Sequence, residues 1–266
     1  MVSYFKHILK SHLGFLIFAM IFIPLIQFLI IEVFTGLETK PFIDSMMKML
    51  PPQIKMMVGD QFFSSLSIEG AVGFGLNHPV VLMILIILLT AITSKHIAGA
   101  IENGTMELLL ALPVKRTTIV SRIWMIVAFI SLVLILFAMA GLFISVMLYD
   151  HLHIDFIEKA LKVGLNLWFL MMVFMSFSLM ISTFMKESGR TASLSSIVIL
   201  VFYFIDMLSG LWKPLVSFKP YNIFHYYQPQ NLMTGQRSLD QNLPVLVILI
   251  LIFSLVSHWQ FQRRDI

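Results

Sequence analysis

Side chains that could do chemistry are scarce in this sequence, and their largest group lies in residues 98–122, a segment that we call the elbow. The elbow holds two carboxylates, Glu102 and Glu107, and a leucine run that ends at Pro113. No Gly-rich phosphate-binding loop of the Walker type occurs anywhere in the chain. If the protein performs work that requires nucleotide hydrolysis, another chain therefore binds and hydrolyses the nucleotide.

A second polar cluster reads Asp150-His-Leu-His-Ile-Asp155, and imidazole and carboxylate groups are metal ligands. No further ligand at a suitable spacing accompanies it, so an exposed polar turn is the favoured interpretation and we predict no metal site. The chain contains no cysteine, which excludes disulfides, zinc–thiolate sites and thiol nucleophiles.

The elements that must position these residues are membrane helices. Apolar residues make up 59% of the chain and charged residues 12%, with a mean hydropathy of +0.92. A soluble domain carries roughly 25% charged residues, so this chain lacks the polar surface to face water. Several apolar runs approach the roughly 20 residues that cross a bilayer. We predict an all-α polytopic membrane protein, one domain over residues 1–266, with two short spans (the second and sixth) that recruit flanking residues. The six predicted spans are residues 13–31, 79–94, 123–148, 163–185, 192–211 and 243–259.

The distribution of charge predicts the orientation. An even number of spans places both termini on one side, where Lys and Arg are denser, while most acids lie on the other side. By the positive-inside rule, both termini and the elbow are predicted to be cytoplasmic, and the loops 32–78 and 212–242 extracellular. The pI of 9.3 and the net charge of +4 have the same explanation, so no nucleic-acid partner is expected.

Residues 1–12 place apolar side chains against Lys and His at helical spacing. This pattern predicts a short helix in the membrane interface, in contact with lipid headgroups. An ordinary extension of the first span is the alternative.

The elbow predicts a short helix that needs two burial surfaces. Asn103 or Thr105 can cap its start, and Pro113 disfavours helical geometry at the preceding residue, about two turns later. The leucines in between cover most of the helix circumference, and a helix that is apolar nearly all round must be buried on more than one side. One side can be the chain's own span ends, and the other needs a partner. A loop helix among lipid headgroups is the alternative.

The sequence resembles the ABC-2-type transporter permeases along its whole length. The run Ala98-Gly-Ala-Ile-Glu-Asn-Gly-Thr-Met-Glu-Leu-Leu-Leu-Ala-Leu-Pro-Val-Lys-Arg116 is similar to the family signature E-x-G-T-x-E-L-L-L-S-L-P-V-S-R. Met49-Leu-Pro-Pro-Gln-Ile-Lys-Met-Met-Val-Gly59 and Leu66-Ser-Ile-Glu-Gly-Ala-Val-Gly73 are similar to segments before the second span. Pro220-Tyr-Asn-Ile-Phe-His-Tyr-Tyr-Gln-Pro229 resembles the S-P-F-H-Y-F-D-P segment, and Phe261-Gln-Arg-Arg-Asp-Ile266 resembles the F-x-R-R-D-L tail.

The resemblance implies a role for the elbow. In this family the short helix between the second and third spans is the coupling helix, which docks in a groove of the ATP-hydrolysing subunit. ATP and Mg²⁺ are bound by that partner, so this chain is expected to hold no cofactor and not to be an enzyme. Two ATPase subunits and a second permease copy complete the complex, with a homodimer expected and its seam near the first and fifth spans. Asn103 departs from the charged residue usual before Gly-Thr. The coupling residues carried over by position are Glu102, Gly104, Thr105, Glu107, Leu110, Pro113 and Arg116.

The segment between the fifth and sixth spans is rich in amphipathic rings. The resemblance implies that it dips back into the outer leaflet and forms an outer gate from Phe224, His225, Tyr226 and Tyr227. Simple anchoring of the rings at the membrane interface is the alternative.

The spans predict an apolar translocation path. No Asp, Glu, Lys or Arg lies in the middle third of any span, so the usual groups of ion and proton sites are missing. Such a path suits a lipid, a hydrophobic peptide or a lipophilic drug. We therefore expect the permease subunit of an exporter in the plasma membrane, working by alternating access. The other function classes are a non-transporting scaffold or immunity subunit and, less favoured, a membrane-embedded enzyme.

Overall fold

The computed structural model describes residues 2–36, 68–148, 154–209 and 212–264, together with the isolated positions 45 and 49, and the regular structure in these ranges is helical. Within them, six helical segments are long and apolar enough to cross a membrane. These are Leu13–Phe34, Glu69–Glu102, Arg116–Leu148, Ile154–Phe184, Ser188–Ser209 and Leu239–Arg263. The prediction of an all-α, six-span membrane protein is confirmed.

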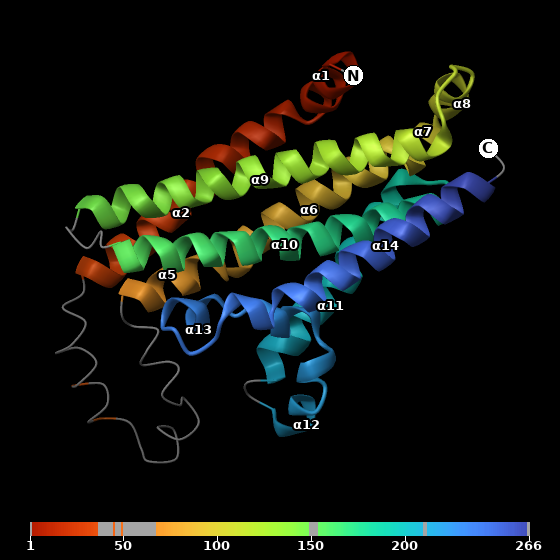
Figure 1. Cartoon of the computed structure of the whole chain (residues 1–266). Helices are drawn as coiled ribbons and strands as arrows, with labels where there is room; N and C mark the ends of the chain where they lie inside the picture. The colour runs from red at the N-terminus through yellow and green to blue at the C-terminus, as the bar shows by residue number, and fades with distance from the viewer. Residues whose placement is uncertain are drawn as a thin grey trace.

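The helices follow one another along the chain as Figure 1 labels them. The first part of the chain forms α1 (Val2–Ser11), α2 (Leu13–Gly36), α5 (Ile68–Leu76), α6 (Pro79–His96), α7 (Ala98–Glu102) and α8 (Thr105–Leu110). The second part forms α9 (Arg116–Leu148), α10 (Ile154–Phe184), α11 (Ser188–Ser209), α12 (Lys213–Val216), α13 (Pro229–Met233) and α14 (Leu243–Arg263). Short 3-10 turns lie between the last three of these helices: η1 (Lys219–Tyr221), η2 (Ile223–Tyr226) and η3 (Leu239–Gln241).

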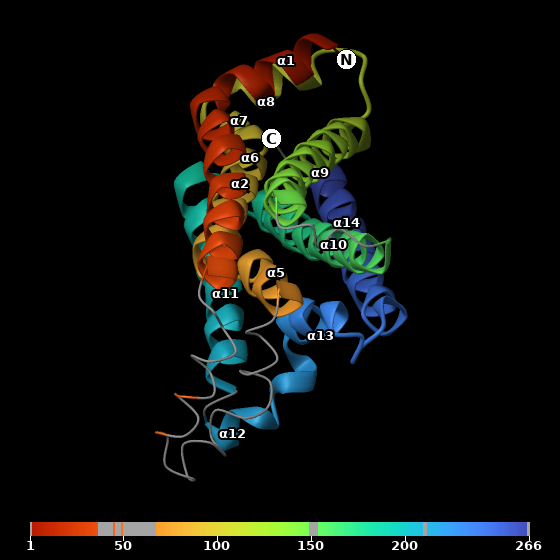
Figure 2. The same cartoon turned by 90° about the vertical axis from the view of Figure 1, so that its left-hand side faces the viewer.

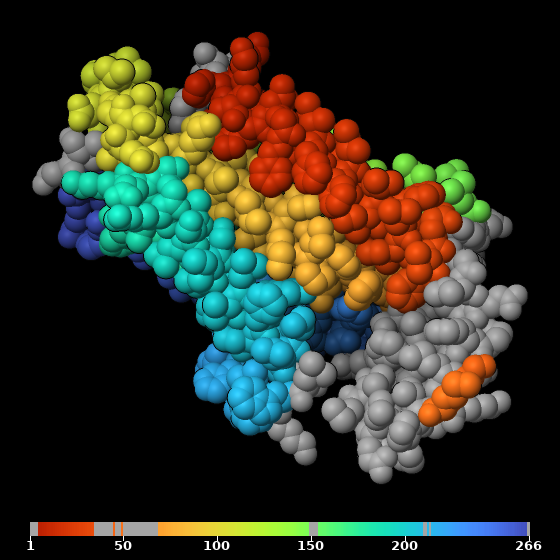
Figure 3. Space-filling model, turned by 180° about the vertical axis from the view of Figure 1, so that it is seen from behind, coloured from red at the N-terminus to blue at the C-terminus, as the bar shows by residue number. Residues whose placement is uncertain are grey.

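The helix α10 forms the centre of the bundle. It packs against α6, α9, α11 and α14, and 67% of its most apolar window is buried, against 17% for α14. The helix α2 packs on α9 and α5 at the rim. On one face of the molecule α2 and α11 lie on either side of α6 (Figure 3), and both expose rows of large apolar side chains there.

The two ends of the bundle differ. The N-terminus, the C-terminus and the pair α7–α8 lie at one end, which we call the elbow end, while α12 and α13 lie at the other, which we call the cap end (Figure 1). This arrangement agrees with the even number of spans. The side of the membrane that each end faces remains a sequence-based prediction.

Several helices begin earlier than the apolar runs indicate. The region 68–76, assigned to the first loop, is the helix α5, and α9 begins at Arg116, inside the segment assigned to the elbow. The helix α10 begins at Ile154, and its first turns carry charged side chains, including an ion pair between Lys159 and Asp155 at 2.7 Å. An apolar run marks only the part of a helix that lies within the hydrocarbon core. The helix itself can continue beyond the membrane into polar residues. The second and sixth spans do recruit flanking residues, as predicted.

The contact between α2 and α9 depends on the absence of a side chain at Gly141. A Cβ atom at this position would lie 2.5 Å from the Pro24 Cα and 2.6 Å from its Cβ. Small residues allow membrane helices to approach at such distances. Pro24 lies inside α2, so the surface that Gly141 meets is backbone and a rigid ring that cannot move aside.

We predict that Gly141→Ala lowers the thermal unfolding temperature of the detergent-solubilised protein by a few degrees. Overpacking of this kind costs about 1–3 kcal/mol, more than the roughly 1 kcal/mol that alanine contributes to a helix relative to glycine. The matched control is Gly14→Ala in α2, where the added Cβ meets no atom within 4 Å. Equal unfolding temperatures for the two variants would contradict the close packing.

Candidate functional site

The elbow is built from two short helices joined at a left-handed glycine. The helix α7 ends at Glu102, and Gly104 has φ +69°, a conformation that residues with a Cβ rarely adopt. The helix α8 therefore leaves α7 at an angle, and Thr105 ties the two together by donating from Oγ1 to the Ala100 carbonyl at 3.1 Å. Neither predicted cap holds, because Gly104 itself is the N-cap and no side chain caps α8.

Only one side of α8 is buried within the chain. Met106 is fully buried, whereas Leu108 is 72% exposed and Leu112, just after the helix, is 54% exposed. Leu109 and Leu110 are half-buried. The prediction that this leucine-rich segment lacks a second burial surface within the chain therefore agrees with the structure. The exposed leucines, together with Glu107 and Pro113, form what we call the open face of the elbow.

Glu102 connects the elbow to the fifth span. Its Oε2 accepts a hydrogen bond of 2.9 Å from the backbone N–H of Ser188, the first residue of α11. A carboxylate at a helix N-terminus is favoured both by the free N–H groups and by the helix dipole. The two segments are close here, since a Cβ on Gly99 would lie 3.2 Å from the Ser188 Cβ. Glu102, predicted to contact an ATPase, thus has a role within the chain.

Arg116 and the C-terminal tail connect the third, fourth and sixth spans. The Arg116 guanidinium donates to the Arg264 carbonyl. Arg264 in turn donates to the Thr183 carbonyl at 2.6 Å and to the Met185 carbonyl at 2.9 Å, at the end of α10. Burial lowers the pKa of Arg264, but a guanidinium remains protonated in proteins. The tail therefore caps carbonyl groups that the end of α10 leaves without helical partners.

A groove of about 510 Å³ separates the N-terminal helix from the elbow. Its walls include His7 of α1, Lys95 and His96 at the end of α6, and Leu108 and Leu112. Figure 2 shows α1 and α8 at the same end of the bundle.

Burial and the nearby Lys95 lower the pKa of His12 to about 4, so this imidazole is neutral at pH 7. The predicted amphipathic helix in residues 1–12 is present as α1.

The structure divides the seven predicted coupling residues into two groups. Four of them form the elbow itself, because they bond within the chain or shape its turn: Glu102, Gly104, Thr105 and Arg116. Three lie on or beside the open face: Glu107, Leu110 and Pro113. The coupling residues carried over from the signature did not include Leu108 in α8 or Leu112 just after it, which are the most exposed leucines of the elbow.

At the cap end, two of the four predicted gate residues belong to the core. Phe224 is buried between Phe174 and Tyr203, with ring centroids 5.2 and 5.4 Å away. The buried Tyr227 hydroxyl donates to the carbonyl of Leu76, the last residue of α5, at 3.0 Å. Burial raises the pKa of Tyr227 well above its ordinary value, which keeps this hydroxyl protonated.

The other two gate residues are half-buried and held by their backbone carbonyls. Asn166 donates to the Tyr226 carbonyl at 3.1 Å, and Arg237 donates to the His225 carbonyl at 2.9 Å. Burial, then Arg237 and Lys219, lower the pKa of His225. Sequence reasoning missed Asn166, although an amide inside an apolar run is a signal that a buried polar partner is present.

Asn222 fixes the start of this segment. Its amide donates to the Phe202 carbonyl at 2.7 Å, and its oxygen accepts from the Phe224 N–H at 2.9 Å. The segment from η1 to α13 is therefore fastened to α5, α10 and α11, and we call it the cap. Whether it opens as a gate stays a prediction.

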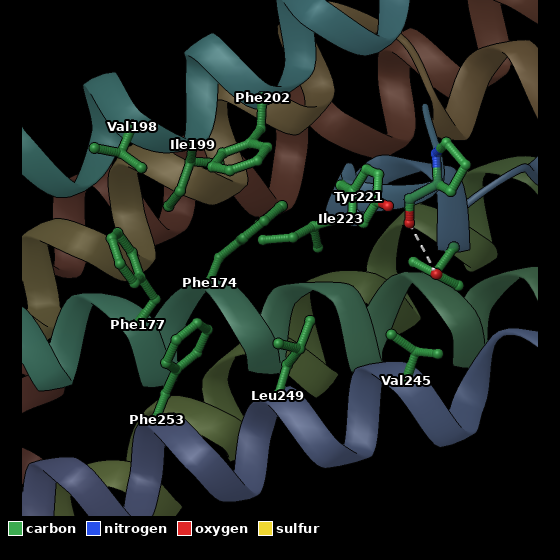
Figure 4. A pocket seen from close by; sticks show the side chains of 12 residues that line it. Phe174, Phe177, Val198, Ile199, Phe202, Tyr221, Ile223, Val245, Leu249 and Phe253 are labelled. Atoms are coloured by element: carbon green, nitrogen blue, oxygen red, sulfur yellow. Dashed lines mark hydrogen bonds between the residues drawn. The ribbon is translucent and has the colours of Figure 1, made fainter. Parts of the chain in front are cut away.

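Beneath the cap lies an apolar groove of about 400 Å³ between α10, α11 and α14 (Figure 4). Its α11 wall carries Val198, Ile199 and Phe202, and its α14 wall carries Val245, Leu249 and Phe253. Phe174 and Phe177 of α10 form the floor, and Pro220, Tyr221, Ile223 and Tyr226 close the end. The only hydrogen bond drawn among these lining residues joins the Tyr226 hydroxyl to the Pro220 carbonyl at 3.0 Å.

Most of the polar cluster at residues 150–155 cannot be placed. Residues 150–153 lie outside the described residues, and Asp155 pairs with Lys159. Among the described residues, no group of three or more His, Asp or Glu side chains could hold a metal ion.

We predict that Tyr227→Phe increases hydrogen–deuterium exchange in α5 and the cap, because the buried Leu76 carbonyl loses its side-chain donor. An unsatisfied buried acceptor costs about 1–3 kcal/mol, and local opening rises accordingly. Tyr221→Phe, at a tyrosine that is 82% exposed, is the matched control. Exchange that is unchanged in Tyr227→Phe would show that the bond does not fasten the cap.

Comparison with known proteins gives one result that agrees with this geometry. The model of the family described as ABC-2 family transporter protein matches residues 5–266. No curated protein matches the chain. The match covers almost the entire sequence and coincides with six membrane-crossing helices. Membrane proteins of this family generally work with ABC ATPase partners. The chain is thus a multi-pass membrane protein and belongs to the ABC-2 transporter family.

Proposed function

We propose that this chain is the permease subunit of an ATP-driven exporter in the plasma membrane, with both termini cytoplasmic and ATP and Mg²⁺ bound by a separate subunit. The observation that carries the proposal is the open face of the elbow, where Leu108 and Leu112 remain exposed at the end of the bundle that holds both termini. Apolar side chains gathered on an exposed surface mark interaction sites. The family membership names the class of partner, an ABC ATPase.

The contacts around the elbow support a route for motion into the membrane. A force on α8 passes through α7 to α6, through the Glu102–Ser188 hydrogen bond to α11, and through residues 111–115 to α9. The position of the elbow between the second and third spans connects it to these two spans, and the Glu102 bond adds the fifth. Closure of two ATPase subunits on ATP would then bias the spans between two arrangements, which is the physical content of alternating access.

Two copies of this chain are proposed to enclose the path. The helices α2 and α11 flank α6 on one face (Figure 3), and α2 exposes Leu13, Ile17, Ile21, Leu25 and Leu29 along this rim. A homodimer seam near the first and fifth spans, as the family resemblance implies, would cover this face. The substrate class that we propose is an amphiphile, such as a lipid, a hydrophobic peptide or a lipophilic drug, because the spans carry apolar side chains with hydroxyls and thioethers.

We predict that the double substitution Leu108→Ser with Leu112→Ser weakens binding of the ABC ATPase at least about tenfold, because buried hot-spot side chains each contribute about 2 kcal/mol or more to an interface. The measurement is co-purification of the cognate ATPase with the tagged chain, together with ATP hydrolysis in proteoliposomes. The matched control is Ile154→Ser, which changes an exposed apolar residue at the cap end. If the double variant binds and stimulates the ATPase like the wild type, the open face is not the docking surface.

A substitution at Glu102 can distinguish binding of the ATPase from transmission of its motion to the membrane helices. We predict that Glu102→Ala leaves the amount of co-purified ATPase within about twofold of wild type but lowers transport per ATP hydrolysed about two- to fivefold. The substitution removes the hydrogen bond between the elbow and α11, which is exposed and therefore contributes about 1 kcal/mol or less. Glu187→Ala, a nearby exposed carboxylate paired with Arg190, is the control. Loss of ATPase binding with Glu102→Ala would instead place this carboxylate in the interface.

A further inference from the structure

The apolar groove between α10, α11 and α14 has the dimensions of half a bilayer. Along α14 its wall runs from Val245 to Phe253, and a rise of about 1.5 Å per residue makes this about 12 Å. One leaflet contributes about 15 Å of a hydrocarbon core that is about 30 Å thick. The groove starts at the cap and ends near the middle of the sixth span, so it lies within a single leaflet.

The groove opens toward the bilayer and not into a sealed core. Val198 and Phe202 on one wall, and Leu249 and Phe253 on the other, are only half-buried. Beside a spanning helix the surrounding medium is hydrocarbon, and a void between apolar walls would forfeit the dispersion contacts of every side chain that lines it. The occupant must therefore be apolar, flexible and available from the membrane.

A cation lies at the mouth of the groove. Lys219 directly precedes Pro220, which lines the groove beneath the cap, and its ammonium interacts electrostatically with the carboxylate of Asp206 as well as with the imidazole of His225. An ammonium at the level of the membrane interface is complementary to a lipid phosphate.

We propose that this groove binds one acyl tail of a membrane phospholipid from the leaflet at the cap end, with the lipid phosphate at Lys219. The site is separate from the elbow and needs only the embedding of the chain in a bilayer. It holds whether or not the ATPase docks as proposed above. A lipid in this position lies against the cap and α11, the elements that Phe224 and Asn222 join.

The test uses the purified full chain without an ATPase, in lipid nanodiscs of phosphatidylethanolamine and phosphatidylglycerol. The probe is phosphatidylglycerol with a diazirine near the middle of one acyl chain, and adducts are mapped by mass spectrometry after illumination. We expect adducts concentrated on the α10 and α14 segments that hold Phe177 and Phe253. Leu249→Trp, which fills the groove, should lower them about tenfold, the effect of losing a modest binding free energy.

Leu251→Trp is the matched control, because Leu251 is an exposed residue of the same helix outside the groove. Should Leu249→Trp fail to elute as wild type in size-exclusion chromatography, Val198→Trp fills the groove from the opposite wall and decides the question. Lys219→Gln is expected to lower labelling by phosphatidylglycerol about two- to fivefold and to leave labelling by a diacylglycerol with the same diazirine unchanged.

Three results would overturn the proposal. The first is labelling spread evenly over all exposed helices and insensitive to both tryptophan variants. The second is an equal loss of labelling by phosphatidylglycerol and by diacylglycerol in Lys219→Gln, which would show that Lys219 does not contact the phosphate. The third is a disulfide between two copies of Leu249→Cys, readily detected because the chain has no cysteine of its own, which assigns the groove to a second copy.

Discussion

The N–H and C=O groups at the ends of a helix have no partners within the helix, and inside a bilayer there is no water to bind them. Helix ends that lie within the membrane therefore need partners from elsewhere in the protein. Side chains distant in sequence meet this requirement in two places, where Tyr227 donates to the carbonyl that ends α5 and Arg264 donates to carbonyls at the end of α10. A third bond lies at the exposed elbow, where Glu102 accepts from the N–H that begins α11. These bonds hold together a bundle whose apolar surfaces alone have little preference between helix and lipid.

The same requirement links the fold to the proposed function. The residues that satisfy helix ends at the elbow end are also those that join the elbow to the spans. A displacement of α8 therefore reaches α6 through α7, α11 through the Glu102 bond, and α9 through residues 111–115. At the cap end, Tyr227 and Asn222 hold the cap against the second and fifth spans. Side-chain bonds therefore reach α11 at its first residue, Ser188, and at Phe202 in its second half, one from each of the candidate functional segments.

Much of this architecture could be predicted from the sequence. The apolar runs predicted all six spans. The leucines of the elbow predicted a short helix that needs a second burial surface, and Leu108 and Leu112 are exposed in the structure. The helix starts at 116 and 154 were missed because hydropathy reports the bilayer and not the helix. The partners of Glu102 and Tyr227 lie 86 and 151 residues away, and no local pattern encodes such pairings. Apart from position 49, the motif at residues 49–59 lies outside the described residues.

The central claim is that the open face of the elbow is where an ATPase subunit acts on the membrane helices. An electron cryo-microscopy structure of the chain bound to its ABC ATPase would test it most directly. Our account predicts that Leu108 and Leu112, now 72% and 54% exposed, become buried against the ATPase while the Glu102 bond to Ser188 persists. An ATPase seated elsewhere, with both leucines still exposed, would contradict it.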